Sequence, residues 1–444
     1  MLYGPTFAEM RDPSLLSEVT RERARDARAR PLDPLNLWNL SWKADGAVPH
    51  VVLPEALTGV RAPIVVLSGR RFPTGSHKVG PAYSILVEKQ LEQACAPGAR
   101  TLVFPSTGNF GIGGAWVGPR MGYRSLVVLP EQMSAERFEK IRGYGAEVVA
   151  TPGSESNVKE IYDKVGQLRA QPENAILNQF EEFANYRFHY HCTAAAASEV
   201  VRGLGLRVAA FVSAMGSAGT IAAGEALKRE HAGCATVAVE PVQCPTLYNV
   251  GFGAHRIEGI GDKHVTWIHN VFATDLLACV DDLECLLGLQ LLQQGRDALV
   301  AEGVPEPVAS GVEDVFGVSG VCNVLGAIKA ARHYGFGPQD ALVTVATDGF
   351  DRYPSVLRRL DAERGPMTRD EARRRLSLFR DPHPDWVMEG TSEARRRWHN
   401  QKYFTWVEQQ GRSVEELRAQ EDPAFWVAQQ ERAAEIDRGI RERR

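Results

Sequence analysis

Short apolar runs and longer amphipathic stretches alternate through most of the chain. The apolar runs are five to seven residues long, the length of strands that are buried on both faces. These predicted strands are Thr101–Pro105, Ser125–Pro130, Glu147–Thr151, Val208–Ala214, Thr236–Pro241 and Ala341–Thr347. Because strands and helices take turns along the sequence, the pattern predicts parallel sheets and an α/β fold.

The stretches between these runs have the apolar spacing of helices that cover a sheet. These predicted helices are Tyr83–Ala94, Ala135–Tyr144, Ser156–Ala170, Thr220–Ala232, Asp282–Glu302 and Val321–Tyr334. Before them, Glu18–Arg30 is typical of a charged surface helix, and Pro31–Pro54 is expected to be extended.

Beyond Tyr353 the pattern changes to charged helical segments that contain tryptophan, and no strand is expected there. The predicted segments are Ser392–Gln410, Val414–Ala419 and Pro423–Arg441. We expect the tryptophans to pack over the core or across a subunit interface. They are Trp386, Trp398, Trp406 and Trp426.

A chain of 444 residues exceeds the length at which one hydrophobic core usually stops growing, so two lobes are expected. We expect an N-terminal helical and extended arm at 1–37, a catalytic core at 38–355 and a helical C-terminal extension at 356–444. Within the core, the smaller lobe is expected at about 83–190.

Composition and charge exclude several classes of protein. An apolar fraction of 44% and a charged fraction of 24% are those of an ordinary globular protein. The net charge is −4, and the charges are spread along the chain without a basic stripe that would suit nucleic acid. The chain has no run of about 18 apolar residues, so no membrane span is predicted. With no apolar leader segment at the N-terminus, we expect a cytoplasmic protein.

Cysteine and histidine spacing points to neither a disulfide framework nor a metal site. The seven cysteines are scattered without Cys-x-x-Cys spacing, so reduced and mostly buried thiols are expected. His189 and His191 lack a third ligand at a recognisable spacing, which favours a packed helix over a metal site.

A turn-rich stretch delivers a lysine to the start of a predicted helix. It runs Pro73-Thr74-Gly75-Ser76-His77-Lys78-Val79-Gly80. Desolvation lowers the pKa of a lysine, and the neutral amine can then form a Schiff base. Lys78 is therefore a candidate for such a bond, with a solvated surface lysine as the alternative.

The second segment, Pro105-Ser106-Thr107-Gly108-Asn109-Phe110-Gly111, turns from a strand end directly into a helix. Free backbone N–H groups and hydroxyls at such a turn suit a carboxylate. Asn109 can also donate to a ring oxygen of a bound cofactor. A plain strand-to-helix turn is the alternative.

The third segment, Ser213-Ala214-Met215-Gly216-Ser217-Ala218-Gly219-Thr220, follows one strand and precedes a helix. Glycines let the backbone approach an anion, and the helix N-terminus and two hydroxyls add favourable groups, so a phosphate fits this loop. The segment lacks the lysine of a P-loop and the spacing of a Rossmann turn, which disfavours a nucleotide.

The fourth segment, Thr344-Val345-Ala346-Thr347-Asp348-Gly349, ends a late strand with a hydroxyl and a carboxylate side by side. Either Thr347 or Asp348 can meet a ring nitrogen of a cofactor. The alternative is an ordinary Asp-Gly turn at a strand end.

Taken in order, the four segments resemble those of the cysteine synthase / cystathionine β-synthase family, enzymes of fold type II that use pyridoxal 5'-phosphate (PLP). The resemblance runs from about Trp38 to Tyr353, with further echoes at Asn178–Phe180, Val237–Pro241, Ile257–Gly261 and Gly317–Gly320. It implies a tryptophan-synthase-β-like α/β architecture, in which two lobes of parallel or mixed sheet are flanked by helices. The helical C-terminal tail would be added to that architecture.

The resemblance also implies a role for each residue. Lys78 would form the internal aldimine and move the Cα proton, and Asn109 would hydrogen-bond the cofactor's ring oxygen. The phosphate would be held by Gly216, Ser217, Ala218, Gly219 and Thr220. The substrate carboxylate would be held by Ser106, Thr107, Gly108 and Gln179. No metal is expected.

Two departures from the family pattern leave the substrate open: Phe110 stands where the family loop usually has Thr, and His77 precedes the lysine. The family's pyridine partner is a serine. Alignment on the strand gives Thr347 and alignment on the following glycine gives Asp348, and we favour Thr347. A hydroxyl leaves the pyridine unprotonated, whereas a carboxylate would keep it protonated.

The reaction that the resemblance implies is β-replacement on a β-substituted amino acid such as an activated serine, through an aminoacrylate, with a cysteine-like product. The alternative is β-elimination, as in a cysteine desulfhydrase or a serine, threonine or diaminopropionate ammonia-lyase. A more remote alternative is a non-catalytic binding protein with the same fold. We expect a small amino-acid substrate and a homodimer.

Overall fold

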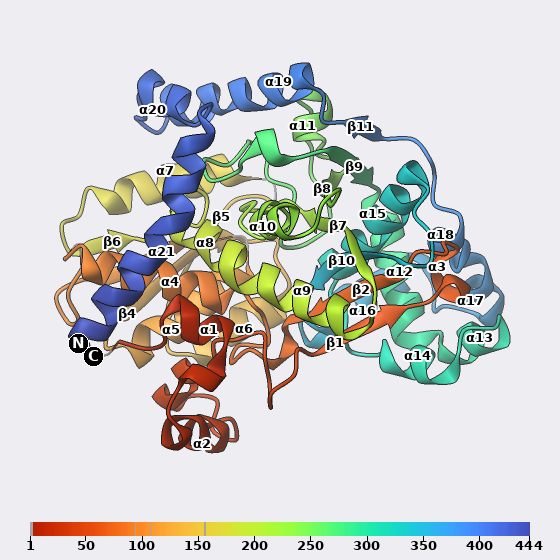
Figure 1. Ribbon diagram of the computed structural model, residues 1–444, viewed down its shortest axis with the longest axis horizontal. Helices are drawn as coiled ribbons and strands as arrows, with labels where there is room; N and C mark the ends of the chain where they lie inside the picture. Colours follow the sequence, from red (N-terminus) through yellow and green to blue (C-terminus); the bar gives the residue numbers. More distant parts are fainter. Residues whose placement is uncertain (1–2, 94, 107, 155–156) are drawn as a thin grey trace.

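The computed structural model describes residues 3–93, 95–106, 108–154 and 157–444, and it has two sheets (Figure 1). The smaller sheet has the strand order β5-β4-β3-β6, and its strands are parallel. Its strands are β3 (Thr101–Pro105), β4 (Arg124–Pro130), β5 (Glu147–Thr151) and β6 (Asn174–Ile176). The helices that connect them are α5 (Asn109–Arg120), α6 (Ala135–Gly143) and α7 (Val158–Arg169).

The larger sheet has the order β1-β2-β10-β7-β8-β9-β11. Its five inner strands are parallel, and the two edge strands β1 and β11 pair antiparallel. The strands are β1 (His50–Leu53), β2 (Ile64–Ser68), β7 (Arg207–Ala214), β8 (Ala235–Pro241), β9 (Leu276–Val280), β10 (Asp340–Ala346) and β11 (Val387–Glu389). Leu342 of β10 is in register with Ile64 of β2, and both side chains are fully buried.

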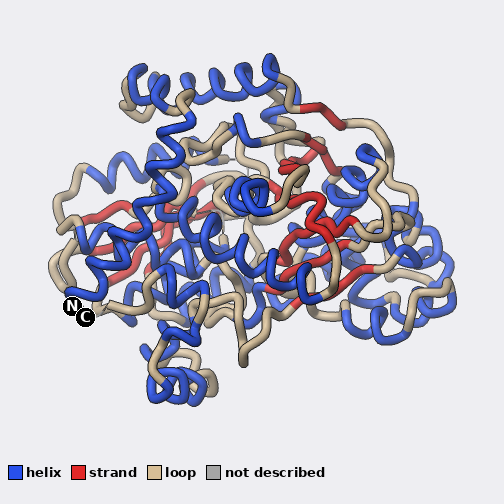
Figure 2. Tube along the Cα trace, in the orientation of Figure 1, coloured by secondary structure: helices blue, strands red, loops and turns tan. Residues whose placement is uncertain are grey.

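Helices cover both sheets from the outside (Figure 2). Those of the N-terminal half are α1 (Phe7–Arg11), α2 (Glu18–Ala27), α3 (Glu55–Thr58), α4 (Val79–Leu91), α8 (Phe183–Phe188) and α9 (Ala194–Gly203). Those that follow are α10 (Ala222–Glu230), α11 (Thr246–Asn249), α12 (Asp282–Gln294), α13 (Arg296–Ala301), α14 (Glu306–Gly311) and α15 (Val318–Tyr334). The C-terminal helices are α16 (Pro354–Arg364), α17 (Arg369–Arg375), α18 (Ser377–Arg380), α19 (Ser392–Lys402), α20 (Val414–Ala419) and α21 (Pro423–Arg443).

The α/β architecture with two sheets flanked by helices is confirmed. All six predicted strands are present, within a residue of the predicted ends. The prediction omits β2 and β9, although each is an apolar run, and it omits β1, β6 and β11. These last three have only three or four residues, so their pairing depends on the neighbouring strand more than on a local pattern.

Helix boundaries differ from the prediction at two places for identifiable reasons. α4 begins at Val79, directly after Lys78, because Pro81 lies in the first turn, where its missing N–H is not needed. The predicted helix Asp282–Glu302 is divided at Gly295 into α12 and α13. Ala94 and Ser156, where two predicted helices end or begin, lie outside the described residues.

The C-terminal segment is helical apart from β11, so the expectation that it contains no strand is wrong at 387–389. β11 adds to the edge of the larger sheet through β9. Trp398 and Trp406 are fully buried, and their indole N–H groups donate to the carbonyls of Leu247 and Val265. The segment therefore packs on the core of its own chain.

The two ends of the chain lie side by side (Figure 1). Asp437 of α21 accepts hydrogen bonds from the backbone N–H groups of Phe7 and Ala8, at 2.6 and 3.0 Å. Arg444 pairs with Glu9 at 2.7 Å. The last helix thus caps the first one. Within the described part of the chain, no helix is long and apolar enough to cross a membrane.

A buried lysine fastens α19 to the core. The Lys402 ammonium nitrogen donates to the carbonyls of Trp267 and His269 and to the Gln420 side chain, at 3.1, 2.7 and 2.6 Å. Lys402→Met keeps the length of the side chain but removes three buried hydrogen bonds, and of their acceptors the His269 carbonyl keeps only the N–H of Val271. We expect the free energy of unfolding to fall by about 3 kcal/mol, measured by denaturant titration. Lys159→Met, at an exposed position, is the control and should change little. Equal stabilities of the two variants would contradict this role for Lys402.

Candidate active site

Lys78 lies at the start of α4 with its amine buried against the glycine loop. The residue is 8% exposed, and its Nζ donates to the Ser217 hydroxyl at 3.2 Å. Burial lowers the pKa of Lys78 to about 8, and the carboxylate of Asp262 offsets part of this decrease. A neutral amine is therefore accessible near physiological pH, as Schiff-base chemistry requires. The alternative of a solvated surface lysine is wrong.

The loop Gly216–Thr220 joins β7 to α10 and leaves no space for side chains at its glycines. A Cβ atom on Gly216 would lie 2.7 Å from the Gly259 carbonyl oxygen. One on Gly219 would lie 2.1 Å from the Asn185 side-chain oxygen. Ala218 has a φ of 57°, in the left-handed region. Such a tight loop before a helix N-terminus has the geometry of an anion site.

Asn185 of α8 ties this loop to Gln179. Its amide nitrogen donates to the Ser217 hydroxyl and to the Gln179 carbonyl, both at 2.9 Å. The oxygen of the same amide is buried and has no partner among the described residues. The structure therefore brings Lys78, Ser217 and the backbone of Gln179 into one cluster.

The segment after β3 is closed by a serine that caps the following helix. The Ser106 hydroxyl accepts hydrogen bonds from the N–H groups of Gly108 and Gly111, at 2.9 and 2.8 Å. Gly108 has a φ of 151°, and a Cβ there would collide with the Arg137 guanidinium. Only glycine suits this position. Thr107 lies outside the described residues.

Asp348 is fully buried and binds groups from several elements. It accepts from Asn109 Nδ2 at 2.6 Å and from the Tyr353 hydroxyl at 3.0 Å. The guanidinium groups of Arg137 and Arg352 lie 3.6 and 3.8 Å from its carboxylate. Thr347, the preceding residue, is only half-buried and directly follows the end of β10.

Backbone contacts join the first and fourth predicted segments. Ser76 and Asp348 form an isolated antiparallel bridge two residues before Lys78. The N–H of Gly317 donates to the Asp348 carbonyl, and a Cβ on Gly317 would overlap the Asp348 carboxylate. The four segments that are separate in the sequence therefore meet around Lys78 and Asp348.

The sequence pattern missed several residues of this site. Asn185 lies in an aromatic helix without a motif, and Arg137 lies in the first turn of α6. Asp262 is buried, with both carboxylate oxygens unpaired among the described residues. In the sequence, the one weak signal for Asp262 is its position directly after the Ile257–Gly261 segment. In the structure, the Gly261 N–H of that segment donates to the Met215 carbonyl at 2.7 Å.

His189 and His191 make hydrogen bonds to hydroxyl and carbonyl groups. His189 contacts the hydroxyls of Thr193 and Thr220, at 2.9 and 3.5 Å, and His191 contacts the Gln430 carbonyl at 2.9 Å. Among the residues that the structure describes, no group of three or more metal-ligating side chains is present.

The site fits an aldehyde cofactor with a phosphate. A buried lysine of lowered pKa lies next to a glycine loop that side chains cannot fill. Asn109 has a buried oxygen without a partner, and one of its two amide hydrogens is held by Asp348. The other hydrogen is available for a cofactor oxygen.

Comparison with known proteins agrees with this geometry. The model of the family described as "Pyridoxal-phosphate dependent enzyme" matches residues 46–284, which is more than half of the chain. Among curated proteins, a cysteine synthase of Staphylococcus aureus is 29% identical over 312 residues, covering 70% of this chain and 94% of that protein. A probable cysteine synthase of Bacillus subtilis is 29% identical over 288 residues, covering 64% and 86%.

Solved structures share the fold. Cysteine synthase from Entamoeba histolytica superposes with a TM-score of 0.63 at 22% identity, covering 76% of this chain and 93% of that one. The O-acetylserine-dependent cystathionine β-synthase from Helicobacter pylori superposes with a TM-score of 0.59 at 25% identity, covering 69% and 94%. The chain therefore belongs to the family of pyridoxal-phosphate-dependent enzymes, and its cofactor is pyridoxal 5'-phosphate.

Proposed function

We propose that this enzyme catalyses β-replacement on a β-substituted amino acid such as an activated serine. The observation that carries the proposal is the buried Lys78 amine, of lowered pKa, against the Gly216–Thr220 loop. The cysteine synthases among the relatives support the reaction class. A homodimer and a cytoplasmic location stay predictions.

In this proposal Lys78 binds the cofactor and moves the proton at the Cα of the substrate. With a pKa of about 8, the amine takes a proton near neutral pH and can give it back. When bound, PLP supplies an electron sink that makes the Cα proton acidic and allows the group on Cβ to leave.

The remaining cofactor contacts follow the same scheme. The N–H groups and hydroxyls of Gly216–Thr220 would hold the phosphate, and Asn109, oriented by Asp348, would donate to the ring oxygen. Thr347 would meet the pyridine nitrogen. The engagement of the Asp348 carboxylate by Asn109 and Tyr353 supports Thr347 over Asp348 in this role.

The substrate carboxylate would bind at the start of α5. Because the Ser106 oxygen accepts two backbone hydrogen bonds, its own hydroxyl hydrogen remains for a carboxylate. Thr107, Gly108 and Gln179 complete the proposed set. Ser106 and Gln179 are buried, and a polar contact is stronger in such surroundings than in water.

The function is tested with purified enzyme and a panel of β-substituted amino acids, with and without a thiol or sulfide. We expect a cofactor absorbance in the visible range and a replacement product that appears only with the nucleophile. Lys78→Ala should abolish turnover, because it removes both the cofactor bond and the proton carrier. Pyruvate as the sole product would instead establish β-elimination, and full activity of Lys78→Ala would exclude the proposed site.

The phosphate loop is tested by Gly219→Asp. A carboxylate at this position would displace Asn185 and repel the phosphate, so we expect loss of the cofactor on desalting. Gly166→Asp is the matched control, because a Cβ on Gly166 meets nothing within 4 Å. The measurement is the absorbance ratio of cofactor to protein. Normal cofactor occupancy in Gly219→Asp would show that the phosphate binds at another part of the chain.

Thr347 and Asp348 are separated by different measurements. Thr347→Val keeps the shape but loses the hydroxyl, which should slow exchange of the Cα proton about 10-fold, whereas Thr347→Ser should keep it. Asp348→Asn removes the buried negative charge between Arg137 and Arg352, although each keeps a second carboxylate partner, so its main effect should be a loss of about 3 kcal/mol in stability. A stable Asp348→Asn enzyme that has lost exchange, beside a normal Thr347→Val, would assign the pyridine to Asp348.

A further inference from the structure

Asp262 is a buried carboxylate that the proposed roles leave unused. It is 6% exposed, and neither carboxylate oxygen has a hydrogen-bond partner among the described residues. Buried polar groups are nearly always paired, and an unpaired carboxylate in a protein interior is costly. An exception of this kind next to a reactive lysine calls for a chemical reason.

The carboxylate lies within the electrostatic reach of the Lys78 amine. Asp262, Gly216 and Ala218 line an inner cavity of about 20 Å³, which has room for one water-sized group. Burial raises the pKa of Asp262 to about 7, and the positive charge of Lys78 offsets part of this increase. The inner cavity therefore places a weak base beside the glycine loop.

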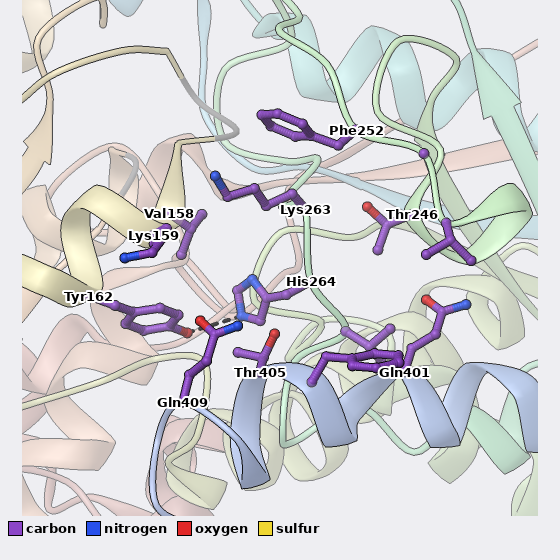
Figure 3. Close-up of a pocket in the computed structure, with 14 residues that line it drawn as sticks. Val158, Lys159, Tyr162, Thr246, Phe252, Lys263, His264, Gln401, Thr405 and Gln409 are labelled. Carbon is purple, nitrogen blue, oxygen red and sulfur yellow. Dashed lines mark hydrogen bonds between the residues drawn. The ribbon is translucent and has the colours of Figure 1, made fainter.

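A larger cavity of about 260 Å³ is lined by residues of α7, of the loop around His264 and of the C-terminal segment (Figure 3). This outer cavity and the inner one are both lined by Thr246, His264 and Val265, so the two spaces share one wall. Gln401 and Thr405 of the C-terminal segment also line the outer cavity, beside Thr246 and His264. Passage past this shared wall would bring a small second substrate from the outer cavity to Asp262.

We propose that Asp262 is a further catalytic residue, the general base for the nucleophile of the proposed β-replacement, on which this inference rests. A neutral nucleophile X–H enters through the outer cavity, and its lone pair forms the X–Cβ bond as the Cα=Cβ double bond, left by loss of the β-substituent, opens toward Cα. The X–H bond breaks as the proton passes to a carboxylate oxygen of Asp262, while Lys78 returns a proton to Cα. Asp262 then releases its proton to solvent.

This assignment also narrows the class of nucleophile. An ionised carboxylate that accepts no hydrogen bond from the protein repels an incoming anion and attracts an X–H donor. The second substrate is therefore a neutral thiol, amine or hydrogen sulfide. An anionic nucleophile would need no base and would meet repulsion at the end of the path.

The other titratable groups around Asp262 do not compete for this role. Glu240 lines the same inner cavity and burial raises its pKa to about 7, but the N–H groups of Leu247 and Tyr248 occupy its carboxylate. Burial lowers the pKa values of His264 and His269 to about 3 and raises those of Tyr162 and Cys244, so all four are uncharged near neutrality.

The test separates the two halves of the reaction in Asp262→Asn. With O-acetylserine alone, a single turnover releases acetate, a step that needs Lys78 and not the nucleophile. Addition of a small neutral thiol then gives the product. We expect normal cofactor absorbance and acetate release within about 3-fold of the parent enzyme, but product formation slowed about 100-fold. Asp163→Asn, an exposed carboxylate on α7, is the control and should be normal in both steps.

Two further readouts distinguish a base from a packing residue. In the parent enzyme the rate of the second step should rise with pH through an apparent pKa near 7, since the ionised form acts, and Asp262→Asn should lose this limb. Formate should restore the second step in Asp262→Gly, because a small carboxylate can occupy the vacated space.

The pH dependence of stability provides a readout that needs no turnover. The pKa of Asp262 is about 7 in the folded chain and near the ordinary aspartate value of 3.8 in the unfolded one. Ionisation therefore removes stability as the pH rises from about 4 to 7. The cofactor-free Asp262→Asn chain should lose less stability over this interval than the parent chain.

Each other outcome has a definite reading. A normal second step in Asp262→Asn overturns the proposal. Equal slowing of both steps also overturns it, because Asp262 would then act through Lys78. If the parent enzyme releases no leaving group from any activated serine, the proposed function itself fails and the inference fails with it.

Discussion

The arrangement of the site depends on the hydrogen bonds and ion pairs of the buried Asp348 carboxylate. Asp348 comes from the end of β10 in the larger sheet, while Asn109 and Arg137 come from helices that flank the smaller sheet. Burying charges is costly unless each finds partners, so this carboxylate and the two guanidinium groups beside it stabilise only one relative placement. The two sheets are thereby held where Asn109 and the segment that carries Lys78 meet at Asp348.

The loops of the site share one topological origin. Ser106 follows β3, Gly216 follows β7 and Thr347 follows β10, so each lies at the carboxyl end of a parallel strand. In open α/β sheets, ligands bind at these ends, because the loops and helix N-termini gather there. The loop of Lys78 likewise leaves the carboxyl end of a parallel strand, β2, and it is joined to the site by the 3.2 Å contact with Ser217 and by the bridge between Ser76 and Asp348.

Much of this could be predicted from the sequence, because a strand followed by a glycine-rich turn leaves a local signal. The six predicted strands and the segments around Lys78, Asn109 and Gly216 are of this kind. Asn185 and Asp262 are not. Asn185 acts through a hydrogen bond to Ser217, 32 residues away. Asp262 stands out because, among the described residues, no group donates a hydrogen bond to its carboxylate. Both are properties of tertiary packing, which no spacing of residue types encodes. The same holds for β11, which is a strand only because β9 lies beside it.

The contact between the first and last helices has a consequence for how the chain is made. A ribosome makes α1 long before α21, so Asp437 is absent while much of this chain already folds. Until α21 is made, the N–H groups of Phe7 and Ala8 lack this carboxylate, and the first turn of α1 relies on its own capping box of Thr6 and Glu9. The cap on the N-terminal arm is therefore completed only when α21 docks, although Phe7 and Met10 belong to the buried core cluster.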